Sequence, residues 1–224
     1  GKVFLASDPV LKRQVAIKIV SMDKQLDEKV RREFLKRFSI EARLSAQLSH
    51  PSIVPVYDAG EEEGVPWIAF QYISGVTLDK LIQTHGKLSV KWAVSIATNI
   101  ASALQQAHKI NVVHRDIKPS NLMLRTSTPA TPGKDDKLVL IDFGGAKQFS
   151  GSVLRSHPTS TRLYSSGYSP YEQIRGGNVG PAADFYALGR TIIQLLTGKY
   201  PPDLEDSLTG KLRWRNYRQI KSDL

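Results

Sequence analysis

The sequence predicts an α+β fold in which a strand-rich N-terminal part precedes a helix-rich C-terminal part. Short segments with alternating apolar and polar residues are concentrated before residue 71, as expected for strands. Longer segments after that residue place apolar side chains three and four positions apart, which is typical of helices. With 224 residues, of which 41% are hydrophobic, the chain can bury a sizeable core.

The bulk composition limits the classes of function. The formal net charge is +10, and such an excess can serve binding to nucleic acid or to an anionic membrane. However, basic residues alternate with acidic ones along 28–37, and neither a zinc-finger spacing nor an aromatic-rich RNA motif accompanies them. No nucleic-acid partner is therefore expected. The absence of cysteine excludes disulfides and thiolate metal sites, and no apolar run reaches the length of a membrane span. The expected location is the cytoplasm.

The chain begins with a predicted β-hairpin. Residues 1–6 and 14–20 have strand character and flank a turn that contains Asp8 and Pro9. Lys18 lies in the second strand between two isoleucines. A lone lysine in a strand is usually an exposed edge charge, so only its wider context can give it a function.

A charged helix and a further strand follow. Residues 24–48 have helical spacing, and one face of this helix carries Phe34, Phe38, Glu41 and Ser45. Residues 65–70 are predicted to form a strand that leads into the segment 71–75.

Capping residues divide the C-terminal part into helices. Thr77 can cap a short helix that stops near Gly86, and Ser89 can cap a longer amphipathic helix. Two short apolar strands, 122–124 and 138–141, enclose a polar segment that reads as an insertion. An apolar helix opens at Asp184 and ends at Gly198, and Asp184 by itself could be a simple N-cap.

Two short polar runs place the groups that phosphoryl transfer requires. The run His114 to Asn121 holds the carboxylate of Asp116, the amine of Lys118 and the amide of Asn121, and Asp142 follows the second apolar strand. Phosphoryl transfer to an alcohol needs a carboxylate for the nucleophile, a cation near the transferred group and oxygen ligands for Mg²⁺. Any one of these residues alone could be a surface charge or a cap.

Together these runs resemble the catalytic loop and the Asp-Phe-Gly motif of protein kinases. Val15-Ala16-Ile17-Lys18, which precedes them, resembles the family's lysine-bearing strand. Lys118, two residues after Asp116, resembles the Ser/Thr-specific branch, and the details around 142–147 and 171–173 resemble bacterial, including cyanobacterial, Ser/Thr kinases.

The resemblance implies a two-lobed fold that covers residues 1–224. Its N-lobe would span 1–71, its hinge 71–75 and its α-rich C-lobe 76–224. We expect this kinase domain to be incomplete, because the first two glycines of the Gly-rich loop and the family's last helices are not in the sequence.

The resemblance also implies roles for individual residues, with ATP and Mg²⁺ as cofactors. Asp116 would be the base, Lys118 the cation on the γ-phosphate, and Lys18 the phosphate-binding lysine paired with Glu41. Asn121 and Asp142 would be the Mg²⁺ ligands. The adenine pocket would comprise Val3, Ala16, Phe70, Gln71, Ile73 and Met123, although Ile73 and Met123 could as well be ordinary core.

Further expectations concern the substrate platform and its regulation. Ser165 would bridge Asp116 and Lys118, and Asp184 would anchor the catalytic loop. Glu172 would be buried without its usual Arg partner, and the candidate substitutes for that partner are Arg190, Arg213 and Arg215. Residues 145–166 would be the activation loop. Phosphate on this loop would pair with Arg115, with autophosphorylation expected at Thr159, Ser160 or Thr161.

The predicted function is ATP-dependent phosphorylation of serine or threonine in protein substrates. One alternative is a pseudokinase that acts as a nucleotide-binding or scaffolding module, and another is a small-molecule kinase of the same fold. The sequence favours the first function because Lys18, Asp116 and Asp142 are all present. The segment 165–172 resembles a platform for a protein substrate.

Overall fold

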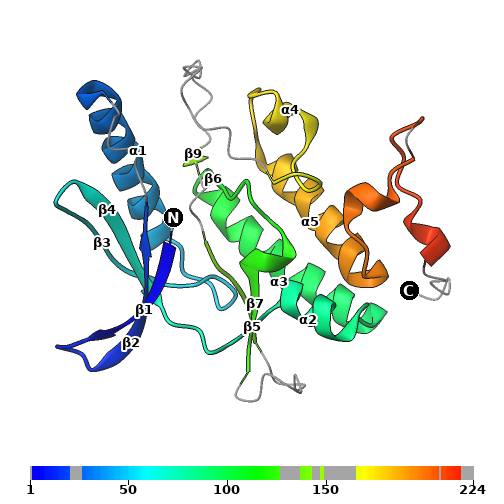
Figure 1. The fold of residues 1–224 in the computed structure, drawn as a ribbon, viewed down its shortest axis with the longest axis horizontal. Helices are drawn as coiled ribbons and strands as arrows, with labels where there is room; N and C mark the ends of the chain where they lie inside the picture. Colours follow the sequence, from blue (N-terminus) through cyan, green and yellow to red (C-terminus); the bar gives the residue numbers. More distant parts are fainter. Residues whose placement is uncertain are drawn as a thin grey trace.

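The computed structural model describes residues 2–20, 27–126, 137–142, 147–148, 165–206 and 208–217. Within these ranges the chain forms a sheet with one long helix, followed by a larger helical part (Figure 1). The two-lobed α+β fold predicted from the sequence is confirmed. Several predicted features lie outside the described residues: Phe143, Gly144, the three candidate phosphorylation sites and most of the polar insertion.

The first lobe is built on a four-stranded antiparallel sheet in the order β1-β2-β4-β3. The predicted hairpin is formed by its first two strands, and Asp8 Oδ1 closes their turn by accepting the N–H groups of Val10 and Leu11 at 3.0 Å. The predicted strand before the hinge pairs with the second strand at the centre of the sheet. The bounds are β1 Lys2–Asp8, β2 Arg13–Ile19, β3 Val56–Glu62 and β4 Val65–Gln71.

Helix α1, Glu28–Ala46, packs on β3 and β4 of this sheet. Its first turn is capped by Asp27, whose side chain accepts the N–H of Lys29. Ser45 is buried, and its hydroxyl donates to the carbonyl oxygen of Glu41 at 2.8 Å. This internal bond satisfies a polar side chain at a position where a larger apolar side chain would fill more space.

The second lobe begins with β5, Gly75–Thr77, and two helices whose starts agree with the sequence. Thr77 caps α2, Leu78–His85, and Ser89 caps α3, Val90–Lys109, each by accepting an N–H of the first turn. Gly86 has a φ of 74°, a conformation that glycine adopts without strain, so the chain turns there.

Helix α5, Pro181–Thr197, is the largest apolar helix after α3 and packs against it. It begins three residues before Asp184, because Pro181 occupies the first turn, where no N–H is required. It ends as expected at Gly198, which is left-handed with φ 70°. Shorter elements surround it, namely α4 Tyr171–Ile174, η2 Pro201–Leu204 and η3 Trp214–Tyr217.

Two small sheets flank the polar loop 114–121, which lies between the lobes. Strands β5, β7 (Leu122–Arg125) and β8 (Lys137–Leu140) form one sheet, while β6 (Val112–Val113) pairs with β9 (Lys147–Gln148). The 3₁₀ turn η1, Pro119–Asn121, leads into β7. Leu140 also bonds the chain after α1, donating to Ser52 O at 2.8 Å and accepting from Val54 N at 3.0 Å. These bonds join the two lobes behind the loop.

Two apolar clusters support this arrangement. The larger lies among α3, α5 and β7, with Ile100, Leu104, Leu122 and Leu195 fully buried. The smaller lies where β4 approaches β8 and includes Phe70, Ile73 and Val139. In the part of the chain that the structure describes, no helix has both the length and the apolarity needed to cross a membrane.

Candidate active site

The polar loop after β6 is fixed from below by Asp184 of α5, whose side chain is completely buried. One carboxylate oxygen accepts the N–H of Arg115 at 2.8 Å, and the other accepts the N–H of His114 at 2.9 Å and bonds His108 Nε2 at 2.8 Å. Asp184 therefore anchors the loop rather than capping its own helix. Sequence reasoning missed His108, because nothing in its local pattern marks it.

The anchor holds a backbone conformation that is otherwise unfavourable. Arg115 has a φ of 69°, in the left-handed region that non-glycine residues rarely adopt. Its side chain donates from Nη2 to Val179 O at 3.1 Å, and its own carbonyl accepts from Gln173 Nε2 at 2.6 Å. Burial lowers the pKa of Arg115, against the opposing effect of Asp184 and Glu41.

His114 lies beneath the loop, in the interior of the lobe. The ring is fully buried, and its Nδ1 accepts the N–H of Asp116 at 3.2 Å. Burial lowers the pKa of His114, and this effect outweighs the nearby carboxylates of Asp184, Asp116 and Asp142, which raise it. A neutral imidazole with Nδ1 as acceptor suits this position.

Asp116 is the centre of a polar network. Lys118 Nζ lies 2.9 Å from Asp116 Oδ2 and donates to Ser165 Oγ at 2.8 Å, and Ser165 Oγ donates to Asp116 Oδ1 at 2.5 Å. The bridge expected of Ser165 is thus present. Asn121 Nδ2 donates to the backbone and carboxylate oxygens of Asp116 at 2.8 and 2.9 Å. These bonds orient the carboxylate from both sides.

Asp142 is brought beside this network by the backbone. Ile141 N donates to Asn121 O at 2.9 Å, so that Asp142 follows directly at the end of the loop, with a left-handed φ of 66°. Its Oδ1 accepts a hydrogen bond from Lys18 Nζ across the gap between the lobes. The predicted pairing of Lys18 with Glu41, which lies half-buried on α1, stays a prediction.

The residues predicted to surround the adenine lie mostly in one place. Ala16 stands opposite Phe70 in the β2–β4 register, and Ile73 and Met123 belong to the same apolar cluster. Gln71 is half-buried and its Oε1 accepts from Arg125 Nη2 at 2.9 Å. Val3 lies on β1 opposite Lys18 and is 64% exposed.

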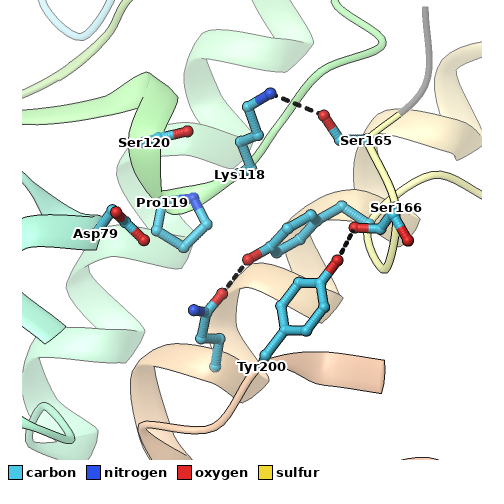
Figure 2. Close-up of a pocket in the computed structure, with 9 residues that line it drawn as sticks. Asp79, Lys118, Pro119, Ser120, Ser165, Ser166 and Tyr200 are labelled. Carbon is cyan, nitrogen blue, oxygen red and sulfur yellow. Dashed lines mark hydrogen bonds between the residues drawn. The ribbon is translucent and has the colours of Figure 1, made fainter. Parts of the chain in front are cut away.

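A cavity of about 340 Å³ opens beside Lys118 and Ser165 (Figure 2). The hydroxyl of Tyr168 donates to Gln194 Oε1 on its wall, and the hydroxyl of Tyr200 donates to Ser166 O at 2.6 Å. Burial raises the pKa of Tyr168. These contacts could not be predicted from local sequence patterns, since the partners lie 26 and 34 residues apart. The lining residues are Asp79, Lys118, Pro119, Ser120, Ser165, Ser166, Tyr168, Gln194 and Tyr200.

The prediction for Glu172 is wrong, because this residue is exposed. It lies in the single turn of α4 at the surface, where water can solvate its carboxylate. The candidate arginine partners have other contacts: Arg190 pairs with Glu205, and Arg213 pairs with Asp206.

Comparison with known proteins gives consistent results. A family model described as the protein kinase domain matches residues 1–222. The serine/threonine-protein kinase PrkC of Bacillus subtilis is 38% identical over 213 residues, which are 95% of this chain and 31% of that protein. PknB of Mycolicibacterium smegmatis is 34% identical, covering 92% of this chain and 32% of that protein. This chain therefore spans about a third of the length of these relatives.

Solved structures agree with the sequence matches. The PknI kinase domain of Mycobacterium tuberculosis superposes with a TM-score of 0.72 at 30% identity, covering 97% of this chain and 77% of that one. The resemblance to bacterial Ser/Thr kinases that was inferred from the sequence motifs is confirmed.

Proposed function

Because this chain belongs to the protein kinase domain family, we propose that it transfers the γ-phosphate of ATP to serine or threonine hydroxyls of protein substrates. The observation that carries the proposal is the network in which Asp116 accepts from Ser165 while Lys118 contacts both. Similarity to serine/threonine kinases supports the choice of acceptor and lends no support to a pseudokinase. We propose the same activity for any longer protein that includes this chain.

On the acceptor side, Asp116 orients the incoming hydroxyl and accepts its proton as the oxygen attacks phosphorus. The bond from the γ-phosphorus to the bridging oxygen breaks, and ADP leaves with the electron pair. Lys118 lies 2.9 Å from Asp116 and so can also approach the transferred group, where a cation offsets the negative charge of the phosphoryl oxygens.

On the nucleotide side, Lys18 binds the phosphates and Glu41 fixes Lys18. Asn121 and Asp142 provide an amide and a carboxylate oxygen, and this hard-oxygen donor set fits Mg²⁺, which commonly binds through one or two carboxylates and the substrate phosphates. Bound there, Mg²⁺ would offset charge on the phosphate oxygens. Asn121 is suited to this because its Nδ2 takes the bonds to Asp116.

The adenine would lie between the lobes, against Ala16, Phe70, Ile73 and Met123, with Val3 above it and Gln71 on the hinge. Residues 71–75 form this hinge between an N-lobe of 1–71 and a C-lobe of 76–224. The backbone bond from Thr126 N to Ser74 O, 3.2 Å long, supports a fixed hinge position.

We also propose regulation by phosphate on the activation loop. Arg115 Nε is buried and has no partner among the described residues, so Arg115 has a donor available for a phosphate on Thr159, Ser160 or Thr161. A phosphate there would bring about −1.5 to −2 charges with which the guanidinium can pair. The cysteine-free composition supports a cytoplasmic location.

The test is transfer of labelled γ-phosphate from ATP to a generic protein, with and without Mg²⁺, followed by identification of the phosphorylated amino acid. We expect Mg²⁺-dependent labelling of serine or threonine. Asp116→Asn should lower kcat by about 10²–10⁴-fold with nucleotide affinity unchanged, since general-base assistance is lost. Equal kcat in the two proteins would refute the role of Asp116.

A further inference from the structure

Arg190 carries its guanidinium from α5 into the interior of the helical lobe. Its side chain is only 8% exposed, and the same helix also buries Ala187, Leu188 and Leu195. A buried guanidinium is costly unless its donors are bonded. The partners of Arg190 therefore show which parts of the molecule it holds.

These partners belong to two segments outside α5. Arg190 Nε donates to the carbonyl oxygen of Gly167 at 2.7 Å, and Nη2 forms an ion pair with Glu205, which directly follows η2. Because a guanidinium is planar and rigid, bonds from two of its nitrogens fix the direction of both acceptors. Arg190 thus ties the turn 165–169 and the segment after η2 to one helix.

The turn 165–169 is the segment that supplies Ser165 to Asp116. It is closed by the N–H groups of Tyr168 and Ser169, which both donate to Ser165 O at 3.1 Å. Gly167 has a φ of +81° and lies so near Pro202 that an added Cβ would come within 2.6 Å of its ring. The turn therefore packs directly on η2, and Gly167 suits this close approach.

Two successive carbonyl groups of this turn accept hydrogen bonds from outside the turn. Tyr200 bonds the carbonyl of Ser166, as Figure 2 shows, and Arg190 bonds that of Gly167. Tyr200 precedes η2 and Glu205 follows it. The turn that supplies Ser165 is thus held by residues of α5 and of the segment around η2.

We propose that Arg190 is a positioning residue for phosphoryl transfer. Through Gly167 it sets where Ser165 Oγ stands between Asp116 and Lys118. The inference rests on the proposed function, because the bridge affects turnover only if Asp116 handles the acceptor hydroxyl. The ion pair with Glu205 keeps the guanidinium in the orientation that reaches Gly167.

The kinetic test compares Arg190→Met with Arg213→Met in the purified protein. Arg213 also pairs with an acid after η2, Asp206, but its side chain is 66% exposed and belongs to a different contact. A misplacement of about 1 Å can cost on the order of 10²-fold in rate. We therefore expect Arg190→Met to lower kcat/KM for a substrate protein by up to about 10²-fold, with KM for ATP unchanged. Arg213→Met should match the wild type.

A second readout does not require transfer activity. Hydrogen exchange at the amides of Tyr168 and Ser169 should be faster in Arg190→Met, whereas amides in the middle of α3 should exchange as in the wild type. An inactive wild type would refute the proposed function and, with it, the role of Arg190 in phosphoryl transfer, whereas faster exchange would still show that Arg190 holds the turn 165–169. Folded Arg190→Met with unchanged exchange at both amides and unchanged kcat/KM would overturn it.

If Arg190→Met fails to fold, the same two measurements on Glu205→Gln test the inference. Glu205 is 39% exposed, so the variant should fold, and glutamine keeps a neutral acceptor for Arg190. Because a bond to a neutral acceptor is weaker than a charge-assisted one, we expect a loss in kcat/KM below about tenfold, with faster exchange at Tyr168. No change in either quantity would refute the role of the ion pair and the inference with it.

Discussion

Replacing Asp184 by asparagine tests how strongly one buried side chain holds the active-site loop. The change is nearly isosteric, but it replaces one of the two acceptor oxygens by an N–H₂ group. In the orientation that retains the bonds to His108 and His114, the new amide nitrogen faces the N–H of Arg115, so that two donors meet without an acceptor.

The expected loss follows from these contacts. A buried N–H left unsatisfied costs about 1–3 kcal/mol, and each of the two remaining bonds loses roughly 1 kcal/mol when its acceptor is no longer charged. The free energy of unfolding should therefore fall by about 3–5 kcal/mol, out of a total of about 5–15 kcal/mol for a typical domain. The left-handed backbone of Arg115 would lose its support at the same time.

Urea unfolding followed by circular dichroism measures the change, with Asp203→Asn as the control. Asp203 is an exposed residue of η2, so its substitution should leave the midpoint within experimental error. The melting temperature of Asp184→Asn should fall by roughly 6–20 °C, at 2–4 °C per kcal/mol for a chain of this size. A midpoint equal to that of the Asp203 variant would refute the assignment of Asp184 as the anchor.

Two further predictions concern single groups of the site. Ser165→Ala removes the hydroxyl that joins Asp116 and Lys118, so its kcat should fall. The kcat of Ser165→Thr, which keeps the hydroxyl, should stay close to that of the wild type. Equal kcat values of the two variants in steady-state transfer assays would contradict this role of the hydroxyl. His114 has a pKa lowered by burial from its ordinary value of 6.5, so the folded state binds fewer protons than the unfolded state, and its contribution to stability is present above pH 6.5 and lost as the pH falls. The free energy of unfolding should decrease from pH 7.5 to 5.5 by at most about 1.4 kcal/mol per pH unit, and His114→Gln should show a smaller slope if this residue is responsible.

Features set by short stretches of sequence were predictable. The caps Thr77 and Ser89 and the left-handed terminus Gly198 depend on the backbone groups of one helical turn, so residue type and neighbours are sufficient. The start of α5 was misplaced because Asp184 suits a cap as well as an anchor. The backbone N–H groups that Asp184 accepts from belong to Arg115 and His114, which lie 69 and 70 residues away in the sequence.

The candidate site likewise contains features that the sequence predicted and features that depend on packing. The family motifs identified Asp116, Lys118 and Asp142 and the bridge through Ser165, and the described contacts agree with that bridge. Glu172 was misjudged, since a motif position does not reveal whether a side chain faces the interior or water. The final surface depends on how α4 packs, and this turn leaves Glu172 exposed.

By itself the sequence predicted the type of chemistry, the main helices, several of the strands, and the residues proposed to carry a phosphoryl transfer. Only the tertiary structure decided which polar groups meet: Asp184 with His108, Arg190 with Gly167 and Glu205, and Lys18 with Asp142. The physical reason is that a buried polar group must find a partner wherever the packed chain brings one. That partner is chosen by the relative position of whole elements, which no local pattern of residues encodes.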